Sequence, residues 1–311
     1  MNRLRPFVAL LLSTAAWGIE ITVAKYAVDG LGGFTTLFVE SAVAAVVLWG
    51  LLLRSGVRRT VPLRHYAVLG LVEPFLLYSA LNVGLQNAQA ADASLLVALL
   101  PVMVLVLSVV FVKERVSLRS LAAVLIATAG GALLATTHVN ARVGLGDGLV
   151  LVACLAAASS VLLVNRLTTQ ASALEITAYQ FGFGFLFTIP VIAVVWGTGY
   201  EAVPGPAQLP KVAAAMGIGL GAFALAYIAY NYAVGRVSVN TAGVALNLTP
   251  LFGVASAVLM LGERLTPVEW AAGAIIVVGL ATFPHEAEPA PDASLPRREG
   301  PRRAEPALKK E

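Results

Sequence analysis

The sequence predicts an all-α integral membrane protein in which ten transmembrane helices form two inverted five-helix repeats around a central cavity. Composition supports the membrane assignment. Of the 311 residues, 59% are hydrophobic and only 12% are charged, about half the charged share of a soluble domain. The mean hydropathy of +0.84 agrees with that assignment. An internal repeat supports the cavity, because two like halves in a bilayer enclose one at their interface.

Ten apolar segments are about as long as the roughly 18 residues that cross a hydrocarbon core. Most are bounded by glycine, proline or charged residues, as helix ends are. Each must be helical, because an open strand in lipid leaves its backbone groups unpaired, and the segments lack the alternation of barrel strands. The predicted spans cover residues 6–28, 33–53, 66–86, 91–112, 118–136, 147–165, 174–196, 211–233, 239–261 and 267–284.

The second half of the chain repeats the first at a separation of 149 residues. The matching residues are Pro101 with Pro250, Tyr78 with Tyr227, Asn82 with Asn231, and Glu114-Arg115 with Glu263-Arg264. Five spans per half is an odd number, so the two halves insert with opposite orientation. We expect a first repeat over 1–136, a second repeat over 137–284 and a disordered cytosolic tail over 285–311.

The distribution of lysine and arginine predicts that both termini lie in the cytoplasm. In this orientation the outer side carries few basic residues, namely Arg142, Lys211 and Arg264 in loops and Lys25 at the end of the first span. A signal peptide is disfavoured, because the N-terminal apolar run continues to Tyr26 and is long enough to span. We expect a multi-pass protein of the bacterial inner membrane, in contact with lipid.

The sequence contains no catalytic or metal-binding constellation. The single cysteine, Cys154, excludes an intrachain disulfide, and the three histidines give no metal motif. No span carries an interior aspartate or a Gly-x-Ser-x-Gly motif, and the phosphate-binding Gly-x-x-x-x-Gly-Lys-Ser/Thr loop is missing. The sequence therefore predicts no enzyme, no cofactor, no metal and no nucleic-acid partner.

Short motifs in register with the repeat resemble those of a known family. They are Trp17-Gly18 with Lys25, Ala93-Ser94-Leu95 leading to Pro101 and Lys113-Glu114-Arg115, Gly146-Asp147, and Pro250 leading to Leu261-Gly262-Glu263-Arg264-Leu265-Thr266. On these motifs, residues 6–284 resemble the drug/metabolite transporter superfamily, specifically its EamA-type exporters and their aromatic amino-acid (YddG-like) branch. The resemblance implies a secondary exporter that works by alternating access. Glu40 departs from the pattern, because EamA-type proteins often have an arginine there.

Tyrosine and asparagine side chains form two matching pairs inside the spans. Tyr78 and Asn82 lie one helical turn apart, as do Tyr227 and Asn231, so each pair shares one helix face. A bare amide is costly in lipid, so these faces should point inward. There they could bind the amine and carboxylate of a zwitterion, or they could lock one helix to another.

Glu20, Glu40 and Glu73 stand inside apolar stretches, where a charged carboxylate costs about 2.5–3.5 kcal/mol. A carboxyl group that took up a proton on one side and released it on the other would couple export to the proton gradient, so protons are a candidate partner. Alternatively, the carboxyl groups form hydrogen bonds to neighbouring helices or line a water-filled vestibule. In that case export is facilitated and is driven by the gradient of the substrate itself. We expect Glu20 and Glu73 to be functional, and Glu40 to pair with Lys25.

Proline and aromatic residues complete the set of candidates. Pro101 and Pro250 lie inside their spans, where each removes a backbone hydrogen bond and kinks its helix. The two kinks could border the cavity and act as bending points, or they could only shape the helix bundle. The aromatic residues that could wall the cavity, or instead face core or lipid, are Trp17, Tyr179, Phe181 and Tyr230. The candidate substrate-binding residues are Trp17, Glu20, Glu73, Tyr78, Asn82, Pro101, Tyr179, Tyr227, Asn231, Asn247 and Pro250.

The sequence favours a secondary exporter of small metabolites, with amino acids, including aromatic and apolar ones, as the first candidates. Other drugs or metabolites, such as quaternary amines or sugar-linked metabolites, are the alternative. An intramembrane enzyme or a channel is less favoured. The cavity should be lined by the first, third and fourth spans and by their counterparts, the sixth, eighth and ninth.

Overall fold

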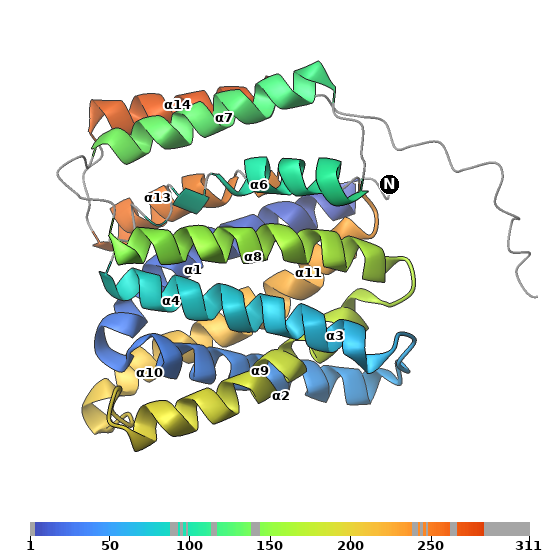
Figure 1. The fold of residues 1–311 in the computed structure, drawn as a ribbon, viewed down its shortest axis with the longest axis vertical. Coiled ribbons are helices and arrows are strands. Elements are labelled where there is room, and N and C mark those ends of the chain that lie inside the picture. The colour runs from blue at the N-terminus through green and yellow to red at the C-terminus, as the bar shows by residue number, and fades with distance from the viewer. Residues whose placement is uncertain are drawn as a thin grey trace, which may run out of the picture.

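The computed structural model describes residues 4–87, 93, 96–97, 99–112, 117–137, 144–237, 242, 245–246, 248–261 and 266–282, and every regular element in these residues is helical. Elements labelled α are α-helices, and those labelled η are short segments with wider or tighter turns. In chain order they are α1 (Leu4–Leu31), α2 (Gly33–Ser55), α3 (Leu63–Gly70), η1 (Leu71–Leu76), α4 (Leu77–Asn87), α6 (Leu100–Leu107), η2 (Ser108–Val112), α7 (Leu118–Thr137), α8 (Leu145–Thr168), α9 (Ala173–Gly197), η3 (Pro206–Gln208), α10 (Leu209–Ile218), η4 (Gly219–Leu225), α11 (Ala226–Val234), α13 (Leu248–Leu261) and α14 (Pro267–Thr282) (Figure 1).

Within the described residues, six helical stretches are long and apolar enough to cross a membrane. They are Leu4–Leu31, Gly33–Ser55, Leu63–Asn87, Leu145–Thr168, Ala173–Gly197 and Pro206–Val234. Shorter apolar helices cover Leu100–Phe111, Leu121–Gly130, Leu248–Met260 and Trp270–Gly279. The prediction of an all-helical membrane protein is thereby confirmed, and each predicted span overlaps one of these stretches.

The third predicted span is a broken helix made of α3, η1 and α4. At Glu73 the backbone is extended, with φ −148° and ψ 119°. Pro74, which follows, has no N–H group to donate to a helical ladder. The eighth predicted span is also composite, because the wider turns of η4 separate α10 from α11. Such turns inside helices are frequent at functional sites.

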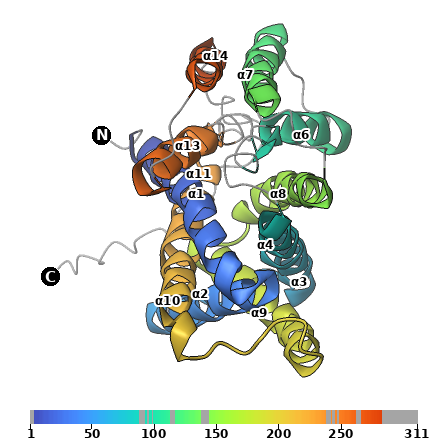
Figure 2. The ribbon, with the colours of Figure 1, turned by 90° about the vertical axis from the view of Figure 1, so that its left-hand side faces the viewer.

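The helices lie roughly side by side and stack along the long axis of the molecule (Figure 1). At one end of the stack α2 packs against α9, and further along it α4 packs against α8, and α1 against α11 and α13. At the opposite end α7 and α14 pack on each other (Figures 1 and 2). Gly18 lets α1 approach α13, since an added Cβ would lie 2.5 Å from the Cβ of Phe252. Small residues commonly allow such close contacts in lipid.

Polar contacts tie α2 to α9 at both ends of this antiparallel pair. At the start of α2, the Glu201 carboxylate accepts the Thr35 backbone N–H at 2.7 Å, which suits the positive end of a helix. Trp196 on α9 also donates to the Thr35 hydroxyl, at 3.0 Å. Beyond the other end of α2, the Thr60 backbone N–H donates to Glu175 on α9 at 2.6 Å. The two helices are therefore linked by polar contacts near both ends of the pair.

Candidate functional site

A cavity of about 90 Å³ lies between the helices, several times the roughly 10–15 Å³ that one water molecule needs. Its walls come from α1, η1, α4, α6, α8, α11 and α13, and from Val97 and Leu246. These segments belong to the six spans that the sequence assigns to the cavity wall. The lining is mostly apolar but includes two carboxyl groups, those of Glu20 and Glu73. Among the residues that the structure describes, no lysine, arginine or histidine lines the cavity.

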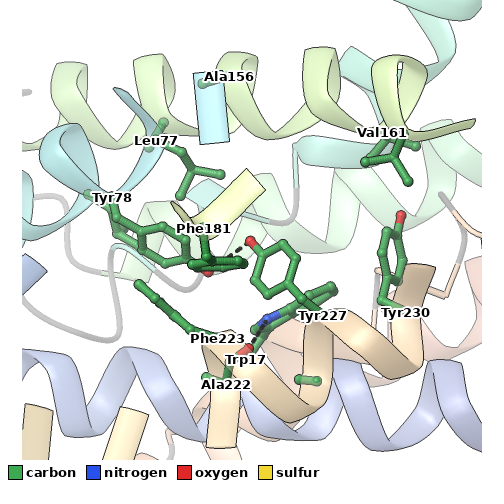
Figure 3. Packing of buried hydrophobic residues seen from close by; sticks show 14 of the residues in the cluster. Trp17, Leu77, Tyr78, Ala156, Val161, Phe181, Ala222, Phe223, Tyr227 and Tyr230 are labelled. Carbon is green, nitrogen blue, oxygen red and sulfur yellow. Dashed lines mark hydrogen bonds between the residues drawn. The ribbon is translucent and has the colours of Figure 1, made fainter. Parts of the chain in front are cut away.

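Three aromatic side chains form one wall of this cavity. Trp17 meets Tyr227 and Tyr230 edge to face, with ring centroids 4.9 and 5.0 Å apart, a geometry that aromatic pairs favour. The Trp17 Nε1–H also donates to the Ala222 carbonyl at 3.2 Å (Figure 3). Figure 3 shows the Tyr230 hydroxyl pointing towards α8, near Val161. The indole ring is thus fixed in place by one hydrogen bond and two ring contacts.

Glu73, at the break in the third span, has hydrogen-bond partners on both carboxyl oxygens. The Tyr227 hydroxyl donates to Oε1 at 2.5 Å, and the Gln180 amide donates to Oε2 at 3.3 Å. The Tyr78 and Tyr227 hydroxyl oxygens are 3.0 Å apart. Because Tyr227 uses its proton at Glu73, Tyr78 is the donor in that second pair. These partners offset the cost of burying the carboxyl group.

Glu20 is buried in a different way. Only 4% of its surface is exposed, yet its Oε1 has no hydrogen-bond partner in the described part of the chain. The Tyr230 hydroxyl and the Thr249 Oγ1, which also line the cavity, are unpartnered in the same sense. A buried polar group without a partner costs about 1–3 kcal/mol. The cavity wall therefore offers one carboxyl acceptor and two hydroxyl groups to a polar solute.

Five of the candidate residues from the sequence are brought together at this cavity, namely Trp17, Glu20, Glu73, Tyr78 and Tyr227. Pro101 and Pro250 do not line it and fall in the first turns of α6 and α13. A first turn needs no N–H from proline, and because part of the segment before each proline lies outside the described residues, the predicted kinks of the spans stay a prediction. Asn247 lies outside the described residues.

The remaining candidates lie away from the cavity. Asn82 donates to Glu40 Oε2 at 3.2 Å, and the Asn231 amide donates to Thr177 Oγ1 at 2.9 Å. Both asparagines thus tie neighbouring helices together, which is the locking interpretation of their pattern. Tyr179 also lies elsewhere, with its ring stacked on that of Tyr66 at a centroid distance of 4.9 Å.

The expected pair of Lys25 and Glu40 is wrong. The Lys25 Nζ donates to the Leu85 carbonyl at 2.8 Å and forms an ion pair with Asp29 at 3.0 Å. Asp29 lies one turn along the same helix, so this pairing needs no reach to another helix. Glu40 is fully buried and has its bond from Asn82 instead.

Some polar residues of the wall are absent from the sequence-based set. Thr249 and Ser160 are absent from it, and Tyr230 was considered only as an aromatic wall. The repeat carried a usable signal for two of them, because Tyr230 and Thr249 stand 149 residues after Leu81 and Leu100, and all four line the cavity. Ser160 stands in a run of small and apolar residues, and no comparable pattern marks it.

The fold and the cavity define a class: a multi-pass, all-helical membrane protein with a partly polar cavity between its helices. Comparison with known proteins then gives the family. Residues 5–136 and 144–283 match the EamA-like transporter family, so the chain belongs to this family. A probable terminal-alkyne amino-acid exporter of Streptantibioticus cattleyicolor is 27% identical over 278 residues, which cover 88% of this chain and 91% of that protein.

Two other similar proteins are named as uncharacterized transporters. One, from Archaeoglobus fulgidus, is 21% identical over 89% of this chain and 98% of its own length. The other, YetK of Bacillus subtilis, is 22% identical over 88% of this chain and 85% of its own length. A solved crystal structure shares the fold, with a TM-score of 0.70, 18% identity, and coverage of 90% of this chain and 94% of that chain. The family and the named relatives make this chain a transporter and not an enzyme.

Proposed function

We propose that the chain is a secondary exporter that carries amino acids out of the cell by alternating access. Membership of the EamA-like family supports a small-molecule substrate. The Streptantibioticus relative, named as a probable amino-acid exporter, supports the substrate class. The single observation that carries the proposal is the set of three polar groups in the cavity wall that have no hydrogen-bond partner among the described residues.

These three groups complement a zwitterion. Glu20 Oε1 accepts from an ammonium group, and charge-assisted bonds of this kind are about twice as strong as neutral ones. The Tyr230 and Thr249 hydroxyls donate to a carboxylate. Leu77 and Leu81, also in the wall, suit an apolar or aromatic side chain, as is usual for small-molecule pockets.

The alternative substrates fit less well. A quaternary amine would meet the Glu20 carboxyl and the Trp17 ring, but it would leave the Tyr230 and Thr249 hydroxyls without partners. A sugar-linked metabolite would need many donors and acceptors, whereas the cavity wall is mostly apolar. An amino acid is the substrate class that uses all three unpartnered groups at once.

Ten spans in two inverted repeats, with boundaries 1–136 and 137–284, are part of the proposal. Cavity residues in register support it: at a separation of 149 they are Tyr78 with Tyr227, Leu81 with Tyr230, Val97 with Leu246, and Leu100 with Thr249. Between the first and sixth spans the separation is 140 instead, and the cavity residues in register are Trp17 with Ala157, Glu20 with Ser160, and Ile21 with Val161. Matching positions that share one cavity are what a pseudo-twofold axis in the membrane plane requires. The predicted tail, 285–311, lies outside the described residues.

We also propose that the protein lies in the bacterial inner membrane with both termini in the cytoplasm. The excess of basic residues on the proposed inner side supports this orientation. Protons are the proposed coupling ion, because Glu20 and Glu73 are carboxyl groups at the cavity and intramembrane acids commonly serve proton relays.

The experiment is counterflow in proteoliposomes that are preloaded with unlabelled leucine and exposed to labelled leucine or phenylalanine. We expect saturable uptake that unlabelled amino acids inhibit. Tyr230→Phe and Thr249→Val should each raise KM several-fold, because each removes one donor to the carboxylate. Glu20→Gln should raise KM by about tenfold or more, because it removes the charge-assisted bond to the ammonium group. Tyr200→Phe, at a tyrosine that is 68% exposed, is the matched control. Absent uptake, or uptake that rises linearly without saturation, would refute the carrier.

A further inference from the structure

A second hollow lies on a neighbouring face of α1, where that helix faces α10 and η4. It is an open groove of about 380 Å³, larger than the central cavity of about 90 Å³. Small residues make up much of its surface: Ala16, Ala214, Gly217, Gly221 and Ala222. We call this hollow the α1–α10 groove.

Glu20 belongs to both the central cavity and the α1–α10 groove. Ala16, Glu20 and Val23 share one face of α1, at the spacing of a single helical stripe, and line the groove. Trp17 and Ile21, on the adjoining face, line the cavity. The buried, unpartnered carboxyl oxygen of Glu20 therefore stands at the wall between the two hollows.

The groove is bordered by side chains that suit a lipid environment. Ile19 lines it and is 44% exposed. Met216 on α10 and Leu220 on η4, which precede the lining residues Gly217 and Gly221 in the sequence, are exposed apolar residues. In a membrane protein such exposed apolar surface meets lipid chains. Gly217 and Gly221 leave room inside the groove, since a Cβ added at either would have no atom within 4 Å in the described structure.

We propose that the α1–α10 groove is a lateral route from the bilayer to Glu20, and that its occupant is a long-chain alkylammonium compound. The alkyl chain lies over the small residues, and the ammonium group donates to Glu20 Oε1. Charge complementarity selects the head group, because no basic side chain lines the groove in the described part of the chain. An alcohol or a fatty acid of equal length gains no charge-assisted bond there. This inference rests on the proposed exporter function, because both use Glu20.

The test is quenching of tryptophan fluorescence by bromoundecylamine, with the protein in phosphatidylcholine nanodiscs. Trp17 is a near reporter, since it lies beside Glu20 in the cavity wall. We expect saturable quenching in the wild type, and quenching by bromoundecanol that is weaker and does not saturate. Glu20→Gln should weaken the affinity for the amine by about tenfold or more, because it removes the charge-assisted bond.

Two further variants address the groove itself. Gly217→Leu and Gly221→Leu place a side chain in its open space and should each weaken amine binding by about tenfold, the effect of losing roughly 1.4 kcal/mol. Gly50→Leu is the matched control, because a Cβ at Gly50 also meets no atom within 4 Å in the described residues, but Gly50 is not part of the groove. Size-exclusion chromatography of every variant establishes that it is folded before titration.

The outcomes separate this inference from the exporter proposal. Equal quenching by the amine and the alcohol, or wild-type affinity in Glu20→Gln or in both groove variants, would overturn the groove as an ammonium route, even if leucine counterflow persists. Amine binding that Glu20→Gln and Gly217→Leu weaken would support it, even if the wild type exchanges no amino acid. In that last case only the exporter proposal would fail.

Discussion

Removal of the Tyr227 hydroxyl should cost far more than removal of the Tyr78 hydroxyl, although the two oxygens are only 3.0 Å apart. Tyr227→Phe deletes the bond to Glu73 and also the acceptor for Tyr78. Tyr78→Phe deletes only one neutral bond. Polar bonds in membrane proteins average about 0.6 kcal/mol and reach about 1.7. We therefore expect about 0.6 kcal/mol for Tyr78→Phe and about 1–2 kcal/mol for Tyr227→Phe.

The double variant gives a sharper test of this network. Once the Tyr227 hydroxyl is gone, the Tyr78 hydroxyl has lost its acceptor, so removing it as well should cost almost nothing further. The unfolding free energies would be measured in mixed detergent micelles for wild type, both single variants and the double variant. Tyr200→Phe, at an exposed site, is the control. Strict additivity, or a larger cost for Tyr78→Phe than for Tyr227→Phe, would show that the two hydroxyl groups are not coupled through the hydrogen bond inferred here.

Further predictions concern protons, packing and a helix end. If Glu20 or Glu73 carries the proton, Glu20→Gln or Glu73→Gln should flatten the pH profile of leucine counterflow; wild-type profiles in both would exclude that role. Gly219→Ala should lower the unfolding free energy by about 1–3 kcal/mol through overpacking, because its Cβ would lie 2.5 Å from a backbone oxygen. Gly217→Ala should raise the unfolding free energy by up to about 1 kcal/mol, because alanine favours the helix more than glycine does and its Cβ would meet no atom within 4 Å in the described residues. Glu201→Gln should cost about 0.3–1 kcal/mol and raise amide exchange at the start of α2; unchanged exchange there would argue against capping.

The helices could be predicted because apolar length is a property of each segment taken alone. The breaks could not be predicted in the same way. Pro74 lies at the break in the third span, yet Pro190 lies inside α9, which runs unbroken from Ala173 to Gly197. Whether a proline interrupts a membrane helix depends on what its neighbours supply to the freed backbone groups, and this information resides in other helices.

The site shows where sequence spacing stops being informative. Residues four apart on a helix are rotated by about 40° from one another, which suffices to separate Tyr78 in the cavity wall from Asn82 on Glu40. The repeat marked Tyr78 and Tyr227 as matched positions, and the structure brings their hydroxyl groups to 3.0 Å from each other, a contact that the sequence analysis did not predict. It did not predict that Glu73 would find partners while Glu20 would not, because those partners come from distant segments.

The ties between α2 and α9 restrict how this protein can change shape. With Glu201 and Trp196 linking one end and Glu175 the segment beyond the other, we expect the two helices to tilt together. The pair would then move as one rigid unit. The bending would occur in segments whose helical hydrogen bonding is already interrupted, such as η1 and η4.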